Sequence, residues 1–145
     1  MNEKINTGNA GEFFVAGELA RRGFTVALPT AKVENIDLLA MQSGSFRQIS
    51  IQVKTAAASK SVWPLSKKHE TLIAENFFYV FVSLNGLEPP NFHVVPSNEV
   101  AVFITENNRR WLSHPKRNGE PRKESTLRHF SDDSNSYLNR WDLLK

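Results

Sequence analysis

The stretch 35–55 constrains the fold more than any other part of the chain. It reads N-I-D-L-L-A-M-Q, then S-G-S-F, then R-Q-I-S-I-Q-V-K-T, so two runs rich in branched aliphatic residues flank a short Ser/Gly segment. This pattern is typical of a β-hairpin, because branched aliphatic residues favour strands while Ser and Gly favour the turn between them. We therefore predict two antiparallel strands joined at residues 43–46.

The register of this hairpin follows if residues 42 and 47 face each other across the turn. Asp37 then lies opposite Gln52, and Asn35 lies opposite Lys54. Because side chains alternate between the two faces of a strand, one face is wholly apolar and is predicted to enter the core. That face comprises Ile36, Leu38, Ala40, Ile49, Ile51 and Val53.

The other face of the hairpin gathers Asp37, Gln52 and Lys54 at one end. Opposed residues have Cβ atoms roughly 4.5 to 5.5 Å apart, so a carboxylate, an amide oxygen and an ammonium converge there without long-range folding. Two interpretations are open. The cluster is either a functional site or the solvated face that any half-buried hairpin presents.

A helix is predicted over residues 8–22, with Thr7 as its N-cap. Glu12 lies on the same side of this helix as Leu19, and a carboxylate beside apolar residues is costly to desolvate unless something pairs with it. A metal ion or Lys54 could be that partner; the alternative is that Glu12 stands at the solvent boundary. The residues that recur at helical spacing are Ala10, Phe13, Phe14, Gly17, Ala20 and Arg21.

Further strands are predicted at residues 24–28, 77–84 and 91–95. The run 77–84 is almost wholly apolar, which is typical of a strand buried on both faces in the centre of a mixed sheet covered by helices. A helix opens at Ser97. Residues 136–145 are predicted to form a short amphipathic helix that docks on the body through Tyr137, Leu138, Trp141 and Leu144.

Residues 56–69 are interpreted as a polar and basic connection around Trp63. Basic side chains beside an exposed aromatic ring suit contact with phosphate and with a base or sugar. Tryptophan is seldom left in water, however, so the expected place of Trp63 is the core or a lid. The basic residues of this connection are Lys60, Lys67, Lys68 and His69.

Length and composition bound the remaining choices. A chain of 145 residues, 40% of them apolar, is the usual size of one compact domain, so a single domain over residues 1–145 is expected. The absence of cysteine excludes disulfides, thiolate zinc sites and a cysteine nucleophile, and the four histidines lack metal-ligand spacing. No apolar run approaches a signal-peptide core or the roughly 20 residues of a membrane span, so we expect a cytoplasmic protein with no membrane partner.

The positive charge is concentrated in the segment 107–130. The net charge of the chain is +3, whereas this segment alone carries 7 basic and 2 acidic residues. Its low periodicity predicts a loop or flap, and its charge indicates contact with nucleic acid, with a solvated loop as the alternative. Together with the connection 56–69, the predicted backbone contacts are Lys60, Lys67, Lys68, Arg109, Arg110, Lys116, Arg117, Arg122, Lys123 and Arg128.

The predicted order of elements is a helix with Glu12, a strand, a strand with Asp37, a strand with x-Gln-x-Lys, a helix and a strand. This order resembles the αβββαβ core of the PD-(D/E)XK, or restriction-endonuclease-like, nuclease superfamily over residues 8–95. The nearest members are Holliday-junction-resolvase-like proteins and intron-encoded homing endonucleases. The resemblance implies an α/β fold with a central mixed sheet flanked by helices.

The sequence departs from the superfamily pattern at two positions. Ile36 stands where the name-giving proline would be, and that proline performs no chemistry. Gln52 stands where the superfamily usually has Asp or Glu. A carboxamide oxygen can coordinate Mg²⁺ but adds no negative charge, so weaker binding of the ion is expected.

The resemblance implies a metal-dependent DNA endonuclease with Glu12, Asp37, Gln52 and Lys54 as catalytic residues. Mg²⁺, or Mn²⁺, would be held by Asp37, the Gln52 oxygen and the Val53 carbonyl, and Glu12 would bind the ion or an ordered water. Lys54 would position the attacking water, lower its pKa, or balance charge in the transition state.

One such site cuts one strand, so a homodimer is expected to act on a duplex. Two alternatives to a DNA endonuclease stay open. One is a catalytically inactive nucleic-acid-binding or assembly module of the same fold, and the other is an RNA-directed nuclease.

Overall fold

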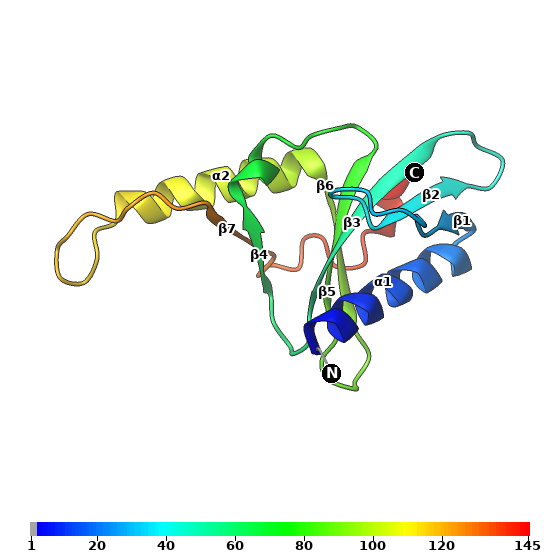
Figure 1. Cartoon of the computed structure of the whole chain (residues 1–145), viewed down its shortest axis with the longest axis horizontal. Helices are drawn as coiled ribbons and strands as arrows, with labels where there is room; N and C mark the ends of the chain where they lie inside the picture. The colour runs from blue at the N-terminus through cyan, green and yellow to red at the C-terminus, as the bar shows by residue number, and fades with distance from the viewer. Residues whose placement is uncertain (1–2) are drawn as a thin grey trace.

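The computed structural model describes residues 3–145 and places a five-stranded mixed sheet between two layers of packed elements (Figure 1). The helix α1 packs on one face, while the helix α2 and a two-stranded sheet pack on the other. The elements in order are α1 (Glu3–Arg21), β1 (Phe24–Ala27), β2 (Leu38–Gln42), β3 (Gln48–Ala56), β4 (Val62–Ser66), the 3-10 turn η1 (Lys67–Glu70), β5 (Phe77–Ser83), β6 (Asn91–Pro96), α2 (Ser97–Ser113), β7 (Leu127–Ser131) and the 3-10 turn η2 (Trp141–Leu144).

The large sheet has the strand order β1-β2-β3-β5-β6. Its strands pair antiparallel except for β3 and β5, which run parallel. Every residue of β5 is buried, as the predicted interior strand requires. The α/β class with a central mixed sheet flanked by helices is therefore confirmed.

The hairpin of β2 and β3 has the predicted register, with Leu38 opposite Ile51. Extended by one residue, this register puts Asp37 opposite Gln52. The predicted pairing of Asn35 with Lys54 is wrong, because Asn35 has a φ of 65° and the strand begins only at Leu38. A left-handed residue at that point turns the chain away from the sheet.

The helix α1 starts at Glu3, so the prediction of Thr7 as its N-cap is wrong. Its buried residues are Gly11, Val15 and Leu19, whereas Phe13 and Phe14 are 64% and 48% exposed. The residues selected by helical spacing thus face away from the core.

A close contact explains which face of α1 is buried. A Cβ atom on Gly11 would overlap the Thr55 hydroxyl of β3, so only glycine allows the helix to approach the sheet this closely. A phenylalanine on this face would have held the two elements apart.

The connection between β3 and β5 differs from expectation. Where the resemblance predicted a helix, the chain forms β4 and η1, and β4 pairs with β7 in the small sheet. Trp63 on β4 is 1% exposed, and its Nε1 donates to the Val82 carbonyl at 3.0 Å. The expectation that Trp63 belongs to the core is confirmed.

The basic segment is more ordered than predicted. Its first residues continue α2 to Ser113, and its last ones form part of β7, so the loop comprises only residues 114–126. This loop lies at the end of α2 that is farthest from the large sheet (Figure 1). We refer to the C-terminal half of α2, this loop, β4 and β7 as the arm.

The C-terminal residues dock on the large sheet as predicted, but they form a single 3-10 turn and not a longer helix. Trp141 and Leu144 are buried beside α1 and the sheet. Asn139 N donates to the Phe92 carbonyl at 2.8 Å, which fastens the segment to β6. Within residues 3–145, no helix is long and apolar enough to cross a membrane.

Candidate functional site

A cleft of about 710 Å³ opens where α1 meets the start of β2. Glu12, Asp37 and Gln52 line it, together with the loop that leads from β1 into β2. The close approach of Gly11 to Thr55 sets the position of the neighbouring Glu12 at the end of the hairpin. Packing of α1 on the sheet thus brings Glu12 to the residues that the β2–β3 hairpin carries.

Asp37 lies directly before β2, where the pairing with β3 ends. Its Oδ2 accepts a hydrogen bond from Val53 N at 2.7 Å, so a side chain continues the hydrogen bonding between the two strands. Burial raises the pKa of Asp37, and the Val53 N–H and the charge of Lys54 oppose that rise. The carboxylate is therefore fixed in place but poorly solvated.

Glu12 is the second carboxylate of the cleft. Its pKa is raised first by burial and then by repulsion from Asp37. A bound cation would stabilise the charged forms of both carboxylates, because burial disfavours each of them and the charge of Asp37 also disfavours that of Glu12.

Gln52 and Val53 complete the oxygen ligands implied by the resemblance. Gln52 is 7% exposed, and its Oε1 is buried with no hydrogen-bond partner among residues 3–145. The N–H and C=O of one strand residue point to the same neighbouring strand, so the Val53 carbonyl is directed to the side of Asp37. Both oxygens are therefore suited to a ligand in the cleft.

Lys54 lies on the same strand face as Gln52, two residues farther along β3. Its pKa is lowered by burial, raised by Asp37 and lowered further by Lys68. The structure thus brings the four predicted catalytic residues, Glu12, Asp37, Gln52 and Lys54, to one site.

The donor atoms fit a hard divalent cation. Mg²⁺ prefers carboxylate, carbonyl and water oxygens, and it usually binds through one or two carboxylates. No group of three His, Asp or Glu side chains that could hold a metal occurs in the described part of the chain. Gln52 adds an amide oxygen to this donor set, because its Oε1 is buried and unpaired among residues 3–145.

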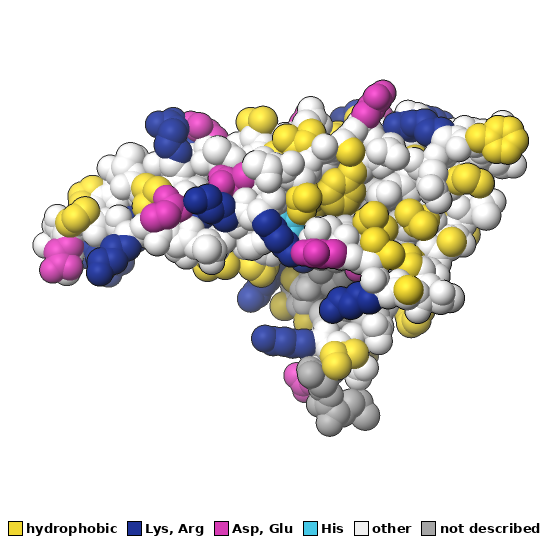
Figure 2. Space-filling view, turned by 45° about the horizontal axis from the view of Figure 1, so that its top comes forward, with side chains coloured by type: hydrophobic (Ala, Val, Ile, Leu, Met, Phe, Trp, Pro, Cys, Tyr) yellow, Lys and Arg dark blue, Asp and Glu magenta, His cyan; other side chains and the backbone are white. Residues whose placement is uncertain are grey.

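Nine of the ten predicted nucleic-acid contacts fall into three groups. Lys68 lines the cleft and pairs with Glu34 at 3.3 Å. Arg109 pairs with Glu106, and Arg122 lies over the Trp111 ring at 4.9 Å. The remaining exposed cations are Lys60, Lys67, Arg110, Lys116, Arg117 and Lys123. Figure 2 shows Lys and Arg side chains across one face, with Asp or Glu beside many of them.

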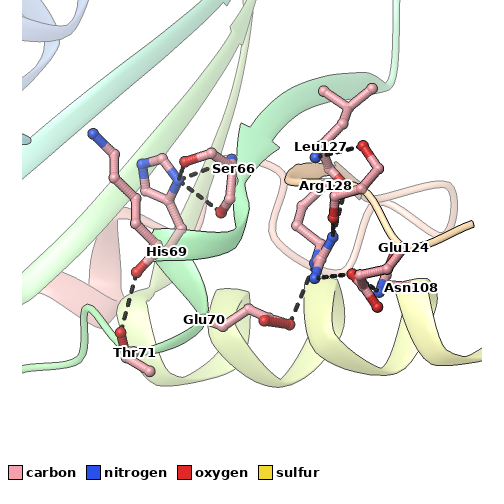
Figure 3. A network of polar contacts seen from close by, with 10 residues as sticks. Ser66, His69, Glu70, Thr71, Asn108, Glu124, Leu127 and Arg128 are labelled. Atoms are coloured by element: carbon pink, nitrogen blue, oxygen red, sulfur yellow. Dashed lines mark hydrogen bonds and ion pairs between the residues drawn. The ribbon is translucent and has the colours of Figure 1, made fainter.

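Arg128 is a correction to the predicted contacts. It is 3% exposed on β7 and pairs with Glu70 at 3.3 Å and with Glu124 at 3.0 Å (Figure 3). A guanidinium buried between two carboxylates is unavailable to a phosphate. Its role is to join β7 to η1 and the loop.

A second cleft, of about 760 Å³, lies between α2 and the segment 131–137, and Trp111 and Asp132 line it. Asp132 is already used, because it accepts from the backbone N–H groups of Ser136 and Tyr137 and contacts His93 Nδ1 at 2.7 Å. The carboxylate therefore orders the local chain and does not present free ligands to the cleft.

The sequence analysis grouped His69 with the basic residues of the connection 56–69 and gave it no part in the metal site. The structure buries it beside the cleft, where Lys54 and Lys68 act on it electrostatically. The available signal was the spacing S-x-x-H at the end of β4, because Ser66 and His69 cap one another across η1.

The class of fold is now defined. The mixed sheet, the helix that carries Glu12 and the hairpin that carries Asp37 and Gln52 form a restriction-endonuclease-like fold. Comparison of the sequence with family models and with curated proteins gives no match.

Two solved structures resemble this chain. I-Ssp6803I, a bacterial homing endonuclease, has a TM-score of 0.61 at 16% identity, over 99% of this chain and 92% of the other. Hjc, a Holliday junction resolvase from the archaeal hyperthermophile Archaeoglobus fulgidus, has a TM-score of 0.52 at 13% identity, over 90% and 86%. These matches confirm the resemblance to the PD-(D/E)XK superfamily at the level of fold.

Proposed function

We propose that this protein is a metal-dependent endonuclease that hydrolyses phosphodiester bonds in DNA. The observation that carries the proposal is the cleft in which Glu12, Asp37 and the unpaired Gln52 Oε1 converge beside Lys54. Support comes also from the fold, because the two similar structures are a homing endonuclease and a junction resolvase.

The oxygens of Asp37, Gln52, Val53 and Glu12 would hold Mg²⁺ or Mn²⁺. When bound, the ion would polarise a phosphoryl oxygen and lower the pKa of a water molecule. The hydrogen bond from Val53 N fixes the orientation of the Asp37 carboxylate before an ion binds. Lys54 would orient the attacking water or balance the negative charge that develops on the phosphate.

We further propose that exposed cations contact the sugar-phosphate backbone at two places, around the cleft and on the arm. Lys67 and Lys68 belong to η1 beside the cleft, whereas Lys116, Arg117 and Lys123 belong to the distant loop. Phosphate contacts of this kind position a protein on DNA without selecting a sequence. For a duplex cut on both strands we propose a homodimer, which light scattering with DNA present would contradict if it found only monomer.

The decisive experiment combines nicking of supercoiled plasmid with calorimetric titration of Mg²⁺ and Mn²⁺. Wild type should nick the plasmid, whereas Asp37→Ala and Lys54→Ala should not, and Asp37→Ala should also lose ion binding. Cleavage by both variants would refute the site. An RNA duplex of the same sequence, tested in parallel, reports whether the sugar matters.

One observation favours a second function. Gln52 contributes no charge, so Glu12 and Asp37 are the two carboxylates at the implied metal site, while Glu34 in the same cleft is paired with Lys68. Binding of DNA without ion binding or cleavage by wild type would identify the chain as a nucleic-acid-binding module that retains the nuclease fold.

A further inference from the structure

The second cleft has no part in the proposed function. It lies between α2 and the segment 131–137, and its volume of about 760 Å³ is that of a site for a small organic ligand. Sites of this kind combine aromatic surface with a few polar groups in fixed positions. The side chains that line the second cleft therefore indicate which ligand it suits.

The face of α2 that lines the second cleft changes in character along the helix. The N-terminal half of α2 buries Val100 and Ile104, whereas the C-terminal half projects from the body of the molecule (Figure 1). On this half, Asn107, Arg110 and Trp111 recur at helical spacing and line the cleft. Within residues 3–145, the side chains of Asn107 and Arg110 form no hydrogen bond and no ion pair.

Arg122 is fixed in the second cleft by contacts that use only part of its guanidinium. The group lies over the Trp111 ring, 4.9 Å from its centroid, and Nε donates to the His114 carbonyl at 2.9 Å. In the part of the chain that the structure describes, the two Nη nitrogens have no partner. An arginine held in this way loses little freedom on binding, and its unused donors match two oxygens of a phosphate.

Trp111 supplies the aromatic surface of the second cleft. It is 42% exposed, whereas the other two tryptophans, Trp63 and Trp141, are 1% and 6% exposed. Nucleobases stack on aromatic rings and also on guanidinium planes, and Trp111 and Arg122 offer both. Tyr137 lines the cleft from the segment 131–137.

The segment 131–137 forms a wall of different chemistry. Besides Tyr137 it contributes hydroxyls and carboxylates, namely those of Ser131, Asp132, Asp133, Ser134 and Ser136. Asp132 accepts from two backbone N–H groups, and Asp133 accepts from the Ser61 hydroxyl at 3.2 Å, so both carboxylates are hydrogen-bonded within the chain. One wall of the cleft thus carries cations and the other carries acceptors. A nucleotide has the matching polarity, with a phosphate at one end and a base that bears amino donors at the other.

We propose that the second cleft binds one nucleotide of DNA whose base is unstacked. Arg110 and Arg122 hold its phosphate, the base stacks on the exposed surface beside Trp111, and the Asn107 carboxamide offers a donor and an acceptor to the base edge. DNA with an unpaired base is then bound more tightly than a regular duplex, because a paired base must first be unstacked at a cost in free energy. This inference deepens the proposed function and rests on it for DNA as the source of the nucleotide.

Three duplexes of one sequence test the second cleft, all in chelator so that no cleavage occurs. One is fully paired, one carries a single bulged adenine, and one carries an abasic residue in place of that adenine. Wild type should bind the bulged adenine about 10-fold more tightly than the other two, because they offer no free base to stack. Acrylamide quenching of tryptophan fluorescence should fall with the bulged adenine alone, since Trp111 is the exposed tryptophan.

Substitutions in the second cleft should remove this preference. Arg122→Lys keeps the charge but loses the planar group, and Arg110→Gln removes a cation without disturbing a contact of the fold. Both should reduce the preference to about 2-fold or less, because the phosphate end of the nucleotide is no longer held. Lys116→Gln is the matched control, because it removes a cation of the same loop that does not line the cleft. It should weaken binding of all three duplexes alike and keep the preference.

Equal affinity of wild type for the three duplexes, or a preference that survives in Arg110→Gln and Arg122→Lys, would overturn the inference. Deoxyadenosine monophosphate serves as a separate probe of the same chemistry. If it binds while the three duplexes bind alike, the cleft takes a free nucleotide and the assignment to DNA is wrong.

Plasmid nicking distinguishes failure of this inference from failure of the proposed function. A wild type that nicks plasmid but binds the three duplexes alike would refute the inference alone. A wild type that prefers the bulged adenine but neither binds an ion nor cleaves would refute the endonuclease and leave the second cleft as a nucleotide site. Asp37→Ala should keep the full binding preference, because the measurement in chelator does not depend on the metal site.

Discussion

The cleft and the arm differ in how their charged side chains are paired. In the arm, the buried Arg128 is matched by Glu70 and Glu124, and its hydrogen bond lowers the pKa of Glu124. In the cleft, Glu12 and Asp37 have raised pKa values, so the metal-free fold disfavours their charged forms. The paired charges of Arg128, Glu70 and Glu124 stabilise the fold. The carboxylates of Glu12 and Asp37 are disfavoured in the metal-free fold, which is typical of a site that binds a ligand of opposite charge.

This difference has a definite sign in pH. Glu12 and Asp37 ordinarily titrate at 4.5 and 3.8, and the fold raises both pKa values. Their contribution to stability is fully present below those ordinary values and is lost as the pH rises through the higher folded values. At neutral pH the two carboxylates therefore destabilise the metal-free protein, and a bound divalent cation should reverse the effect.

The largest expected effect comes from Asp37→Asn. Cleavage should fall by at least about 10²-fold, because a charged ligand is lost from the site of transition-state stabilisation. The metal-free variant should nevertheless melt at a higher temperature than wild type at pH 7, since a disfavoured charge is removed. Plasmid nicking and thermal unfolding, each with and without Mg²⁺, measure both.

The same variant gives a control within one experiment. Mg²⁺ should raise the melting temperature of wild type and leave that of Asp37→Asn almost unchanged. At pH 4 the melting temperatures of the two metal-free proteins should converge. A lower melting temperature for Asp37→Asn at pH 7 would contradict this expectation, because it would show that the Asp37 carboxylate stabilises the metal-free fold.

The arm should respond in the opposite way to loss of a charge. Arg128→Met should destabilise the fold by about 2–3 kcal/mol, because it leaves Glu70 partly buried without its partner. Arg109→Ala removes an exposed cation that pairs with Glu106 and should leave the midpoint of unfolding nearly unchanged. Urea unfolding compares the two. Equal losses of stability in the two variants would mean that the buried ion pairs of Arg128 do not stabilise the fold.

The sequence predicts the hairpin well and the arm poorly, for a physical reason. A period of two and a Ser/Gly turn fix which residues of β2 and β3 share a face, so Asp37 and Gln52 could be placed together. The pairing of β4 with β7 joins strands about sixty residues apart, and no local pattern specifies it. Arg128 therefore could not be told from the exposed cations of its segment.

For the helix α1, the sequence predicted the helix but not the face that is buried. Its spacing allowed two faces to enter the core, and the larger side chains, Phe13 and Phe14, suggested the wrong one. Burial was decided by Gly11, through a close approach to Thr55 that only the folded sheet reveals. The position of Glu12 beside Leu19 was nonetheless correct, because it depends only on helical geometry.

Gln52→Glu adds a charge to the cleft. An added carboxylate beside Asp37 should tighten Mg²⁺ binding about 10-fold, because ligand charge strengthens binding of hard cations. The new group is buried beside Asp37, so its pKa should be raised and the metal-free variant should be less stable than wild type at pH 7 but not at pH 4. Calorimetry and thermal unfolding measure the two effects. Tighter binding without loss of metal-free stability would mean that the cleft already accommodates the added charge.

The smallest effects should come from the exposed cations of the loop 114–126. Lys116→Gln and Lys123→Gln should each reduce the slope of log affinity for DNA against log salt concentration by about 0.9, if each neutralises one phosphate. Stability should change by less than about 0.5 kcal/mol, since both side chains are exposed. Cleavage at saturating DNA should be unchanged, because the loop lies at the far end of α2 (Figure 1). An unchanged salt slope in both variants would exclude both lysines from contact with DNA, and their charge would then serve only the solvation of the loop.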